Sequence, residues 1–250
     1  MKSDKQHTSA ILESRLKKKL YSRLPDYIFS NDLFENWIKE SLHSDSVWID
    51  AGCGKNTLVS EFEGISSHGT GIDAVIHPEL NPDRNKFIQS KLDKIPLPDS
   101  YADTIIMNMV VEHISNIEQV FKELRRILKP GGNLIFRTTN KYYPTQLFGH
   151  LMPKKIKDKI IYKIFGVESH DIFGTFYKIN TMNKIKHTLP KYGFSIYRLE
   201  AVEDLHVFNS LVFELSYIIY KLQKLNSFYR LRNCIVCWAK KVISQSFNLL

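Results

Sequence analysis

The chain has 250 residues, 43% hydrophobic and 24% charged, which is typical of one α/β domain with additions. Its three cysteines, Cys53, Cys234 and Cys237, are too few and too sparse for a secreted disulfide scaffold and favour a reducing cytoplasm. No run of 18 apolar residues occurs, so no membrane-spanning helix is expected. Residues 1–24 are charged throughout, so no signal segment is expected either. The net charge of +9 suits nucleic acid, a membrane surface or an anionic substrate, and a lysine-rich genome would produce it equally.

Two helices are predicted before residue 46. Leucines recur at four-residue spacing, which is a helical stripe: Leu12, Leu16, Leu20 and Leu24. Pro25 ends this helix, and a second helical stretch covers 31–42. We expect residues 1–45 to form N-terminal helices that precede the core domain in sequence.

From residue 46 the pattern alternates between strands and helices. Apolar runs typical of buried parallel strands lie at 47–50, 70–73, 86–90, 104–109 and 133–138. Helical patterns lie at 58–62 and 115–128, and the second opens with the capping-box spacing of Ser115 and Glu118. This second helix has an apolar stripe made of Ile117, Val120, Phe121, Leu124 and Leu128. After an interruption at 140–180, a helix at 182–189, a strand at 194–199, an amphipathic helix at 208–225 and a strand at 234–239 follow. This order predicts a doubly wound α/β sheet with helices on both faces.

A glycine-containing loop, Asp50-Ala-Gly-Cys-Gly-Lys-Asn56, follows the first strand. Glycines at the carboxyl end of a strand let a ligand approach the backbone closely. Dinucleotide-binding loops carry a third glycine where this chain has Thr57. The acid Asp50 also suits a cofactor with a positively charged amino acid end better than a pyrophosphate. Asp73, 21 residues after Gly52 at the end of the second strand, can accept both hydroxyls of an adenosine ribose.

Five motifs occur in the order found in one large family: Asp50–Asn56, Asp73, Leu97–Asp103, Val111–His113 and Leu124–Gly132. In these motifs the chain resembles the class I methyltransferases that depend on S-adenosylmethionine (SAM). It is most similar to the type 11-like subgroup, which includes quinone-biosynthesis C-methyltransferases and small-molecule O-methyltransferases. The resemblance implies a mostly parallel, seven-stranded, Rossmann-like sheet with an antiparallel last strand and helical insertions.

The resemblance also implies the residues of a SAM site. The loop residues Gly52, Cys53 and Gly54 would lie against the amino acid end of SAM, with Asp50 near its ammonium. Asp73 would hold the ribose; Leu92 and Asp93, in the stretch after Lys91, would flank the adenine; Asn108 and Met109 would line the floor. Asn56 replaces the usual last glycine of the loop, and Lys91 stands where the subgroup often has an acid.

We expect different segments of the chain to bind SAM and the acceptor. Residues 46–139 form the SAM-binding core, 140–180 a substrate-cap insertion, and 181–250 the rest of the core with an inserted amphipathic helix at about 204–230. The cap and the 200–233 region would build the acceptor pocket.

Methyl transfer from a sulfonium mainly requires alignment and the exclusion of water, although a hydroxyl acceptor also benefits from a base. His113 is the candidate base; the alternative is that it only packs or caps the next helix. His170, Asp171 and Tyr177 in the cap are candidate substrate contacts. The chain has Asn108-Met-Val-Val instead of the Asn-Pro-Pro-Tyr typical of nucleobase or amide N-methylation. Oxygen or carbon methylation of a small-molecule, lipid-linked or saccharide acceptor is therefore expected, without a metal and without a specific nucleic-acid partner.

Basic amphipathic helices leave a second function class open. Lysines gather in the cap at 154, 155, 157, 159 and 163, where they suit a phosphate-bearing acceptor, anionic lipid or a solvated face. A protein with the SAM fold that binds membrane surfaces without turnover is the alternative function, and a nicotinamide-dependent reductase is a more distant one. The expected location is the cytoplasm, with peripheral membrane contact as an addition.

Overall fold

The structure is a computed structural model that describes residues 2–54, 57–75, 87–143, 174–207, 209–224 and 228–243. Side chains are described within these ranges except those of residues 2–9 and 57. Most of the predicted cap, including His170 and Asp171, lies outside the described residues.

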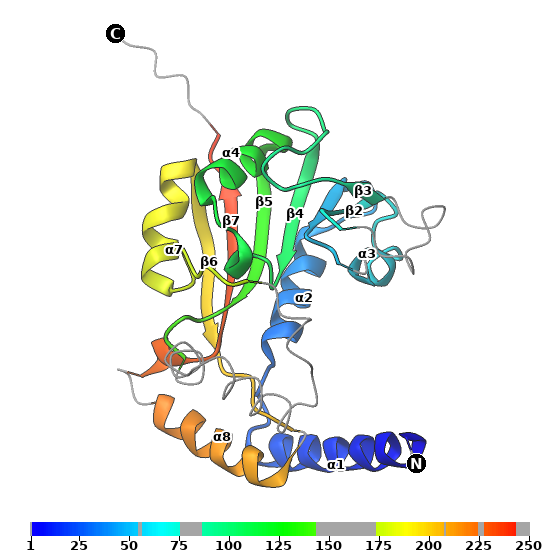
Figure 1. The fold of residues 1–250 in the computed structure, drawn as a ribbon, viewed down its shortest axis with the longest axis vertical. Helices are drawn as coiled ribbons and strands as arrows, with labels where there is room; N and C mark the ends of the chain where they lie inside the picture. Colours follow the sequence, from blue (N-terminus) through cyan, green and yellow to red (C-terminus); the bar gives the residue numbers. More distant parts are fainter. Residues whose placement is uncertain are drawn as a thin grey trace.

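A seven-stranded sheet forms the centre of the molecule, in the order β3-β2-β1-β4-β5-β7-β6 (Figure 1). The strands are β1 (Trp48–Ala51), β2 (Gly69–Asp73), β3 (Phe87–Gln89), β4 (Ala102–Asn108), β5 (Leu128–Thr139), β6 (Phe194–Val202) and β7 (Cys234–Lys241). The first five pair in parallel, whereas β7 runs antiparallel to both β5 and β6. The predicted fold class, including the antiparallel last strand, is confirmed.

The carboxyl ends of the parallel strands share one edge of the sheet. Asp50 of β1 pairs with Gly71 of β2 and with Ile106 of β4. The antiparallel strands reach the same edge, because Cys234 at the start of β7 pairs with Thr139 of β5 and Val202 of β6. We call this the carboxyl edge; it lies toward the bottom of Figure 1.

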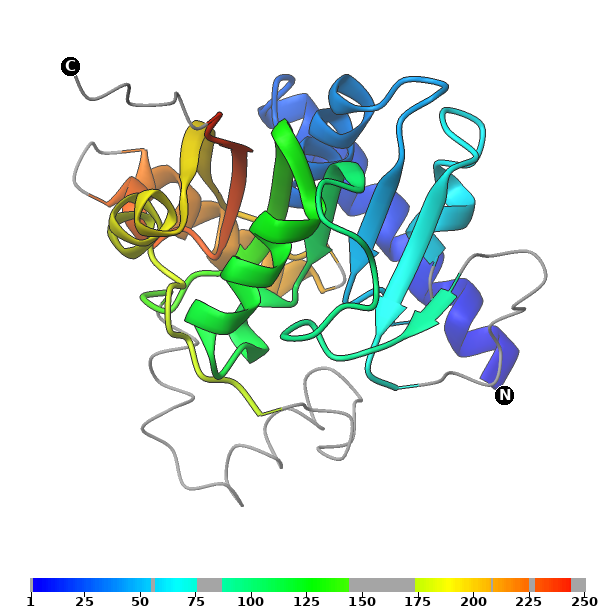
Figure 2. The ribbon, with the colours of Figure 1, turned by 90° about the horizontal axis from the view of Figure 1, so that it is seen from above.

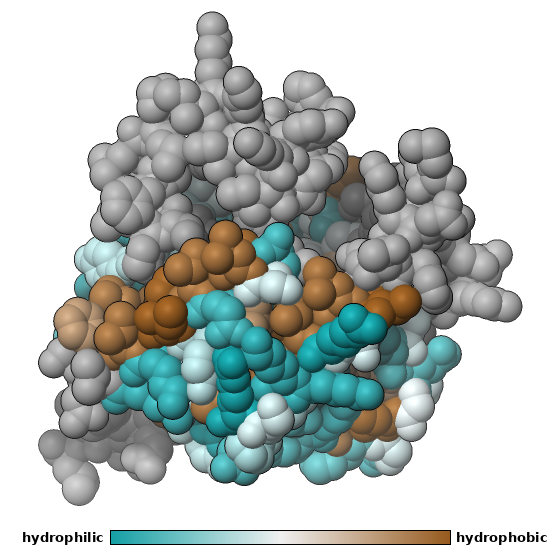
Figure 3. Space-filling view, turned by 90° about the horizontal axis from the view of Figure 1, so that it is seen from below, coloured by the Kyte–Doolittle hydropathy of each residue, from teal (hydrophilic) through white to brown (hydrophobic). Residues whose placement is uncertain are grey.

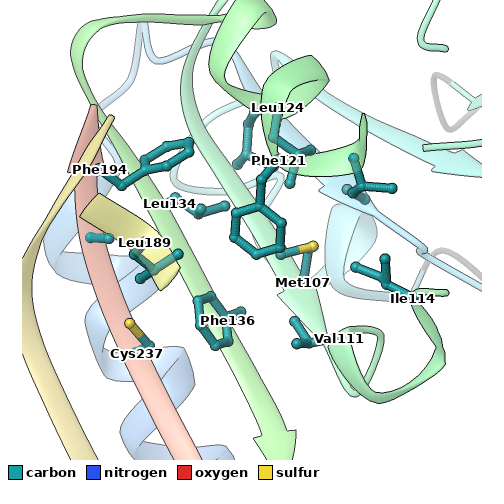
Figure 4. Packing of buried hydrophobic residues seen from close by; sticks show 14 of the residues in the cluster. Met107, Val111, Ile114, Phe121, Leu124, Leu134, Phe136, Leu189, Phe194 and Cys237 are labelled. Carbon is teal, nitrogen blue, oxygen red and sulfur yellow. The ribbon is translucent and has the colours of Figure 1, made fainter. Parts of the chain in front are cut away.

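One face of the sheet is covered by α4 (Ile117–Ile127), α7 (Met182–Thr188) and η3 (Leu189–Tyr192). Figure 4 shows Phe121 and Leu124 of α4 directed toward the sheet residues Met107, Leu134 and Phe136. All five side chains are fully buried, so the apolar stripe predicted for this helix forms the main core.

The opposite face is covered by α2 (Ser30–Ser41) and α3 (Thr57–Glu61) (Figure 2). Phe34 and Trp37 of α2 pack with Phe62 against Trp48 and Ile106 of the sheet. Alternate residues of β4 thus serve opposite faces: Ile106 faces α2, and Met107 faces α4. Burial on both faces explains the continuous apolar run of this strand.

A pair of helices, α1 (Lys2–Arg23) and α8 (Ser210–Gln223), packs beneath the carboxyl edge. Leu16 and Leu20 of α1 contact a small core that includes Phe213 of α8. The pair is attached to the end of β6, because the Tyr27 hydroxyl donates to the carbonyl of Glu203 and accepts from the Leu205 N–H at 2.8 Å. No helix in the described ranges is long and apolar enough to cross a bilayer.

Two local predictions needed correction. The N-cap of α4 is Asn116, whose side chain accepts from the Gln119 N–H at 3.2 Å, so Ser115 is not the cap. Residues 128–132 belong to β5, although the strand was predicted only at 133–138: Leu128, the predicted end of the helix, pairs with Ala102, and Asn133 pairs with Thr104. The intervening Lys-Pro-Gly-Gly residues form a bulge, because these four residues of β5 lie opposite a single residue of β4, Asp103.

Candidate active site

The glycine loop after β1 has a backbone that glycine favours. Gly52 has φ +82° and Gly54 has φ +53°, values that residues with a Cβ rarely adopt. A Cβ at Gly52 would lie 2.5 Å from Val110 Cγ2, whereas nothing lies within 4 Å of a Cβ built at Gly54. Gly52 is therefore required for packing, and the space beside Gly54 is open to a ligand.

Hydrogen bonds from the end of β2 hold this loop. The N–H groups of Gly52 and Cys53 donate to the Ile72 carbonyl at 2.7 and 3.1 Å. The Gly54 N–H donates to Asp73 Oδ2 at 2.9 Å, and the Val75 N–H donates to Asp73 Oδ1 at 2.9 Å. A carboxylate offers about four acceptor positions, so Asp73 retains capacity for ribose hydroxyls while it shapes the loop.

Asp50 is the most unusual acid of the site. It is 2% exposed, and its Oδ1 has no hydrogen-bond partner among the described residues. Burial, followed by the nearby charges of Asp73 and Glu61, raises the pKa of Asp50 to about 7. A buried carboxyl without a partner is costly, and a ligand that brings a cation to this position would offset that cost.

The same acids act on Cys53. Its thiol is half-buried, and its pKa is raised above the ordinary value by burial first and by Asp50 and Asp73 second. The thiol therefore stays protonated near neutral pH and is a poor nucleophile. Cys53 contributes loop backbone and a small polarizable surface to the site.

Asn108 and Met109, which the resemblance assigns to the floor of the SAM site, lie at the end of β4 and directly after it. The side chain of Asn108 accepts from Arg137 Nε at 2.9 Å, and the Met109 N–H donates to the Arg137 carbonyl at 2.9 Å. Met109 has φ +57°, a strained value for a residue with a side chain. Arg137 also donates to the Ser30 hydroxyl at 3.0 Å, so α2 braces this floor.

Leu92 and Asp93 follow β3 at the same edge. Leu92 is partly buried and packs against the main core, whereas Asp93 is exposed. The Asp93 carbonyl accepts from Gln119 Nε2 at 3.3 Å, which fixes the stretch against α4. Their contact with adenine stays a prediction.

His113 lies in η1 (Val111–His113), directly after the floor. Its Nδ1 is 3.0 Å from the Gly174 carbonyl. Because a carbonyl only accepts, Nδ1 carries the proton, and in the neutral ring Nε2 is then the basic nitrogen.

Tyr177 joins the site through the backbone of η1. The N–H groups of Phe176 and Tyr177 donate to the Glu112 carbonyl at 2.8 and 3.3 Å. Tyr177 is 7% exposed and has φ +47°. The structure thus brings His113 together with the last part of the cap, although a contact of Tyr177 with substrate stays a prediction.

Several polar residues of this edge were missed by sequence reasoning. Glu112 is 3% exposed and its Oε2 accepts from the Thr138 hydroxyl at 2.7 Å, which in turn accepts from Asn180 Nδ2 at 2.6 Å. Such partners come from distant parts of the chain and follow no period, so only the position of Glu112 within the Val111–His113 motif could have drawn attention to it. Among the described residues, no group of three or more His, Cys, Asp or Glu side chains could hold a metal ion.

Comparison with known proteins identifies the family. Residues 13–198, about three quarters of the chain, match the family described as a methyltransferase domain. The chain is 28% identical over 120 residues to the mitochondrial ubiquinone biosynthesis O-methyltransferase of Mus musculus, covering 43% of this chain and 32% of the relative. It is 28% identical over 127 residues to a ubiquinone/menaquinone biosynthesis C-methyltransferase of Vibrio cholerae, covering 42% and 48%. The match therefore spans less than half the length of these curated relatives.

Solved structures agree on the fold. A SAM-dependent methyltransferase from Archaeoglobus fulgidus superposes with a TM-score of 0.54 at 18% identity, covering 83% of this chain and 91% of that one. This fold accounts for the order of the strands, for the glycine loop and for the two acids at the ends of strands, Asp50 and Asp73. The chain belongs to the methyltransferase-domain family, within the class I SAM-dependent methyltransferases.

Proposed function

We propose that the protein transfers a methyl group from SAM to an oxygen or carbon atom of a small-molecule, lipid-linked or saccharide acceptor. The observation that carries the proposal is Asp50, a buried carboxyl whose Oδ1 has no partner among the described residues and which precedes a glycine loop with open space at Gly54. A positively charged amino acid end of a cofactor fits this arrangement. The names of the relatives include both O- and C-methyltransferases, which supports either atom as acceptor.

The residues present fit SAM as follows. Asp50 pairs with the ammonium, and Asp73 accepts the ribose hydroxyls. Leu92 and Asp93 flank the adenine, and Asn108 and Met109 form the floor. When bound, SAM supplies an activated methyl group on a sulfonium; the chain's part is to align the acceptor and exclude water.

His113 is proposed to take the proton from a hydroxyl acceptor. The bond from Nδ1 to Gly174 fixes the ring and leaves Nε2 as the base in the neutral form. The same bond ties the base to Gly174 in the cap, so substrate contacts by Tyr177, His170 and Asp171 fit the proposal.

The alternative of a SAM-fold protein without turnover gains no support from the comparisons, since the matched family and relatives are methyltransferases. Incubation with methyl-labelled SAM and separate lipid and aqueous cell fractions tests turnover. Label in one fraction would give the acceptor class; label in neither would argue for the alternative.

Calorimetric titration with SAM tests the cofactor assignment. We expect Asp73→Ala to weaken binding by roughly 1.5–3 kcal/mol, because charged hydrogen bonds are lost. Asp45→Ala, an exposed acid before β1, is the matched control and should leave affinity unchanged. Equal affinity in the two variants would contradict the assignment, and parallel binding of NAD would favour a reductase.

A further inference from the structure

The outer face of α8 carries aliphatic side chains that are exposed on the surface. Five of them repeat along one side of the helix with 37–70% of their surface exposed: Leu211, Leu215, Ile218, Ile219 and Leu222. The inner side of the same helix is buried through Phe213 and Ser216. An apolar stripe of about 16 Å is therefore presented outward from a helix that is already anchored. Figure 3 shows it as a band over α8 that continues toward α1.

The same platform, defined as α1 and α8 with the C-cap Lys224, is strongly basic. From residue 10 onward it holds seven basic side chains and two acids, a net charge of +5. Both acids are neutralised: Glu13 pairs with Lys17 at 2.7 Å, and Glu214 pairs with Lys19 at 2.5 Å and Arg23 at 2.9 Å. In Figure 3 hydrophilic side chains border the apolar band. Lys18, Lys221 and Lys224 are exposed.

The apolar stripe of α8 and the basic charge of the platform together favour one kind of binding partner for this face. A second copy would bring another surface of +5 against the first, and the repulsion would oppose pairing. Protein interfaces favour aromatic residues and arginine and contain little lysine, whereas this face combines leucine, isoleucine and lysine. An apolar stripe bordered by lysine is the pattern of a helix that lies in the interface of an anionic bilayer.

We propose that the outer face of α8, with the lysines of the platform, docks the protein on an anionic membrane surface. The platform is fixed to the end of β6 through Tyr27 and lies beneath the carboxyl edge. Docking therefore turns the edge that holds Asp50, Asp73 and His113 toward the bilayer, and an acceptor embedded in the lipid would reach the site from that side. Docking itself does not depend on turnover.

Co-sedimentation with vesicles of phosphatidylcholine and phosphatidylglycerol at about 3:1 tests the proposal. The full chain should bind at about 0.05 M salt, bind much less at 0.5 M, and not bind pure phosphatidylcholine, because salt screens the lysines. Leu215→Gln with Ile218→Gln should weaken binding on the order of 100-fold, since two aliphatic side chains leave the interface. Lys221→Gln with Lys224→Gln should weaken binding and reduce the salt dependence.

The matched control replaces two exposed aliphatic residues at the opposite end of the molecule. Val242 and Ile243, 45% and 63% exposed, lie just after β7; Val242→Gln with Ile243→Gln should keep vesicle binding within about twofold. Both α8 positions are more than half exposed, so unchanged thermal unfolding should accompany the loss.

Three results would overturn the proposal. These are no sedimentation at low salt, equal binding of the α8 variant and wild type, or a concentration-dependent dimer without lipid that the α8 variant abolishes. The last result would assign the face to a second copy. SAM titration of the same variants separates docking from cofactor binding: failure of docking with intact SAM affinity leaves the proposed function standing.

Discussion

Asp50 is expected to act in opposite directions on stability and on binding. Its folded-state pKa is about 7, whereas an unfolded aspartate loses its proton near pH ~3.9. Between these values the folded state binds more protons, so the stability contributed by the protonated form is present at low pH and is lost as pH rises through about 7.

Asp50→Asn therefore should raise the free energy of unfolding of the ligand-free protein above pH 7 by about 2–4 kcal/mol, while SAM affinity falls. Chemical denaturation from pH 4 to 8 is the measurement, and the difference from wild type should vanish near pH ~4. Glu203 is also buried, with a pKa raised to about 7, but it is present in both proteins and cancels in the comparison. A variant less stable than wild type at pH 8 would contradict the argument.

Replacing His113 can distinguish a catalytic role of this residue from a packing role. If Nε2 accepts the proton of a hydroxyl acceptor, His113→Gln should lower the transfer rate by about 10²- to 10⁴-fold without changing SAM affinity. An unchanged rate with lowered stability would assign the residue to the packing of η1 against Gly174.

At the scale of elements, periodicity was a good guide and single boundaries were not. The apolar runs predicted every strand, and the stripe of α4 identified its buried face. The predicted N-cap of α4 was wrong by one residue. Ser115 and Asn116 are both good N-cap residues, and the spacing between Ser115 and Glu118 favoured the wrong one. In the folded helix Glu118 instead pairs with Lys122 at 2.6 Å.

The N-cap of α4, Asn116, can be tested with a pair of substitutions. Asn116→Ala should lower the free energy of unfolding by about 1 kcal/mol, because the Gln119 N–H loses its acceptor. Ser115→Ala, at the neighbouring exposed position, should change it by less than about 0.5 kcal/mol. Chemical denaturation of both variants is the measurement, and the reverse order would restore the capping box.

At the scale of the whole molecule, the predictable part of the site is the part that is local in sequence. Asp50, Gly52 and Gly54 lie within one loop, and Asp73 ends the adjacent strand, so topology alone brings them together. The pairs Arg137–Asn108 and Glu112–Thr138 are separated by 29 and 26 residues. They obey no period, and polar contacts of this kind cannot be derived from a hydrophobic pattern.

Cofactor binding should be visible in the stability of the entire domain. At a SAM concentration of 100 times Kd, a ligand that binds only the folded state adds about 2.7 kcal/mol. For a chain of this length that corresponds to a rise in Tm of about 5–10 °C. Differential scanning calorimetry with and without SAM measures it, with Asp73→Ala as the control; an equal shift in both proteins would place SAM elsewhere.

The ion pairs between α1 and α8 also determine the order in which the chain can assemble. Lys19 and its partner Glu214 are 195 residues apart, so the leucine face of α1 leaves the ribosome long before its partner helix exists. At about 5–20 residues per second, this face waits roughly 10–40 s while the sheet forms. During that interval it is a candidate for chaperone capture or for premature contact with lipid, and α1, although synthesised long before α8, reaches its native packing only after α8 has formed.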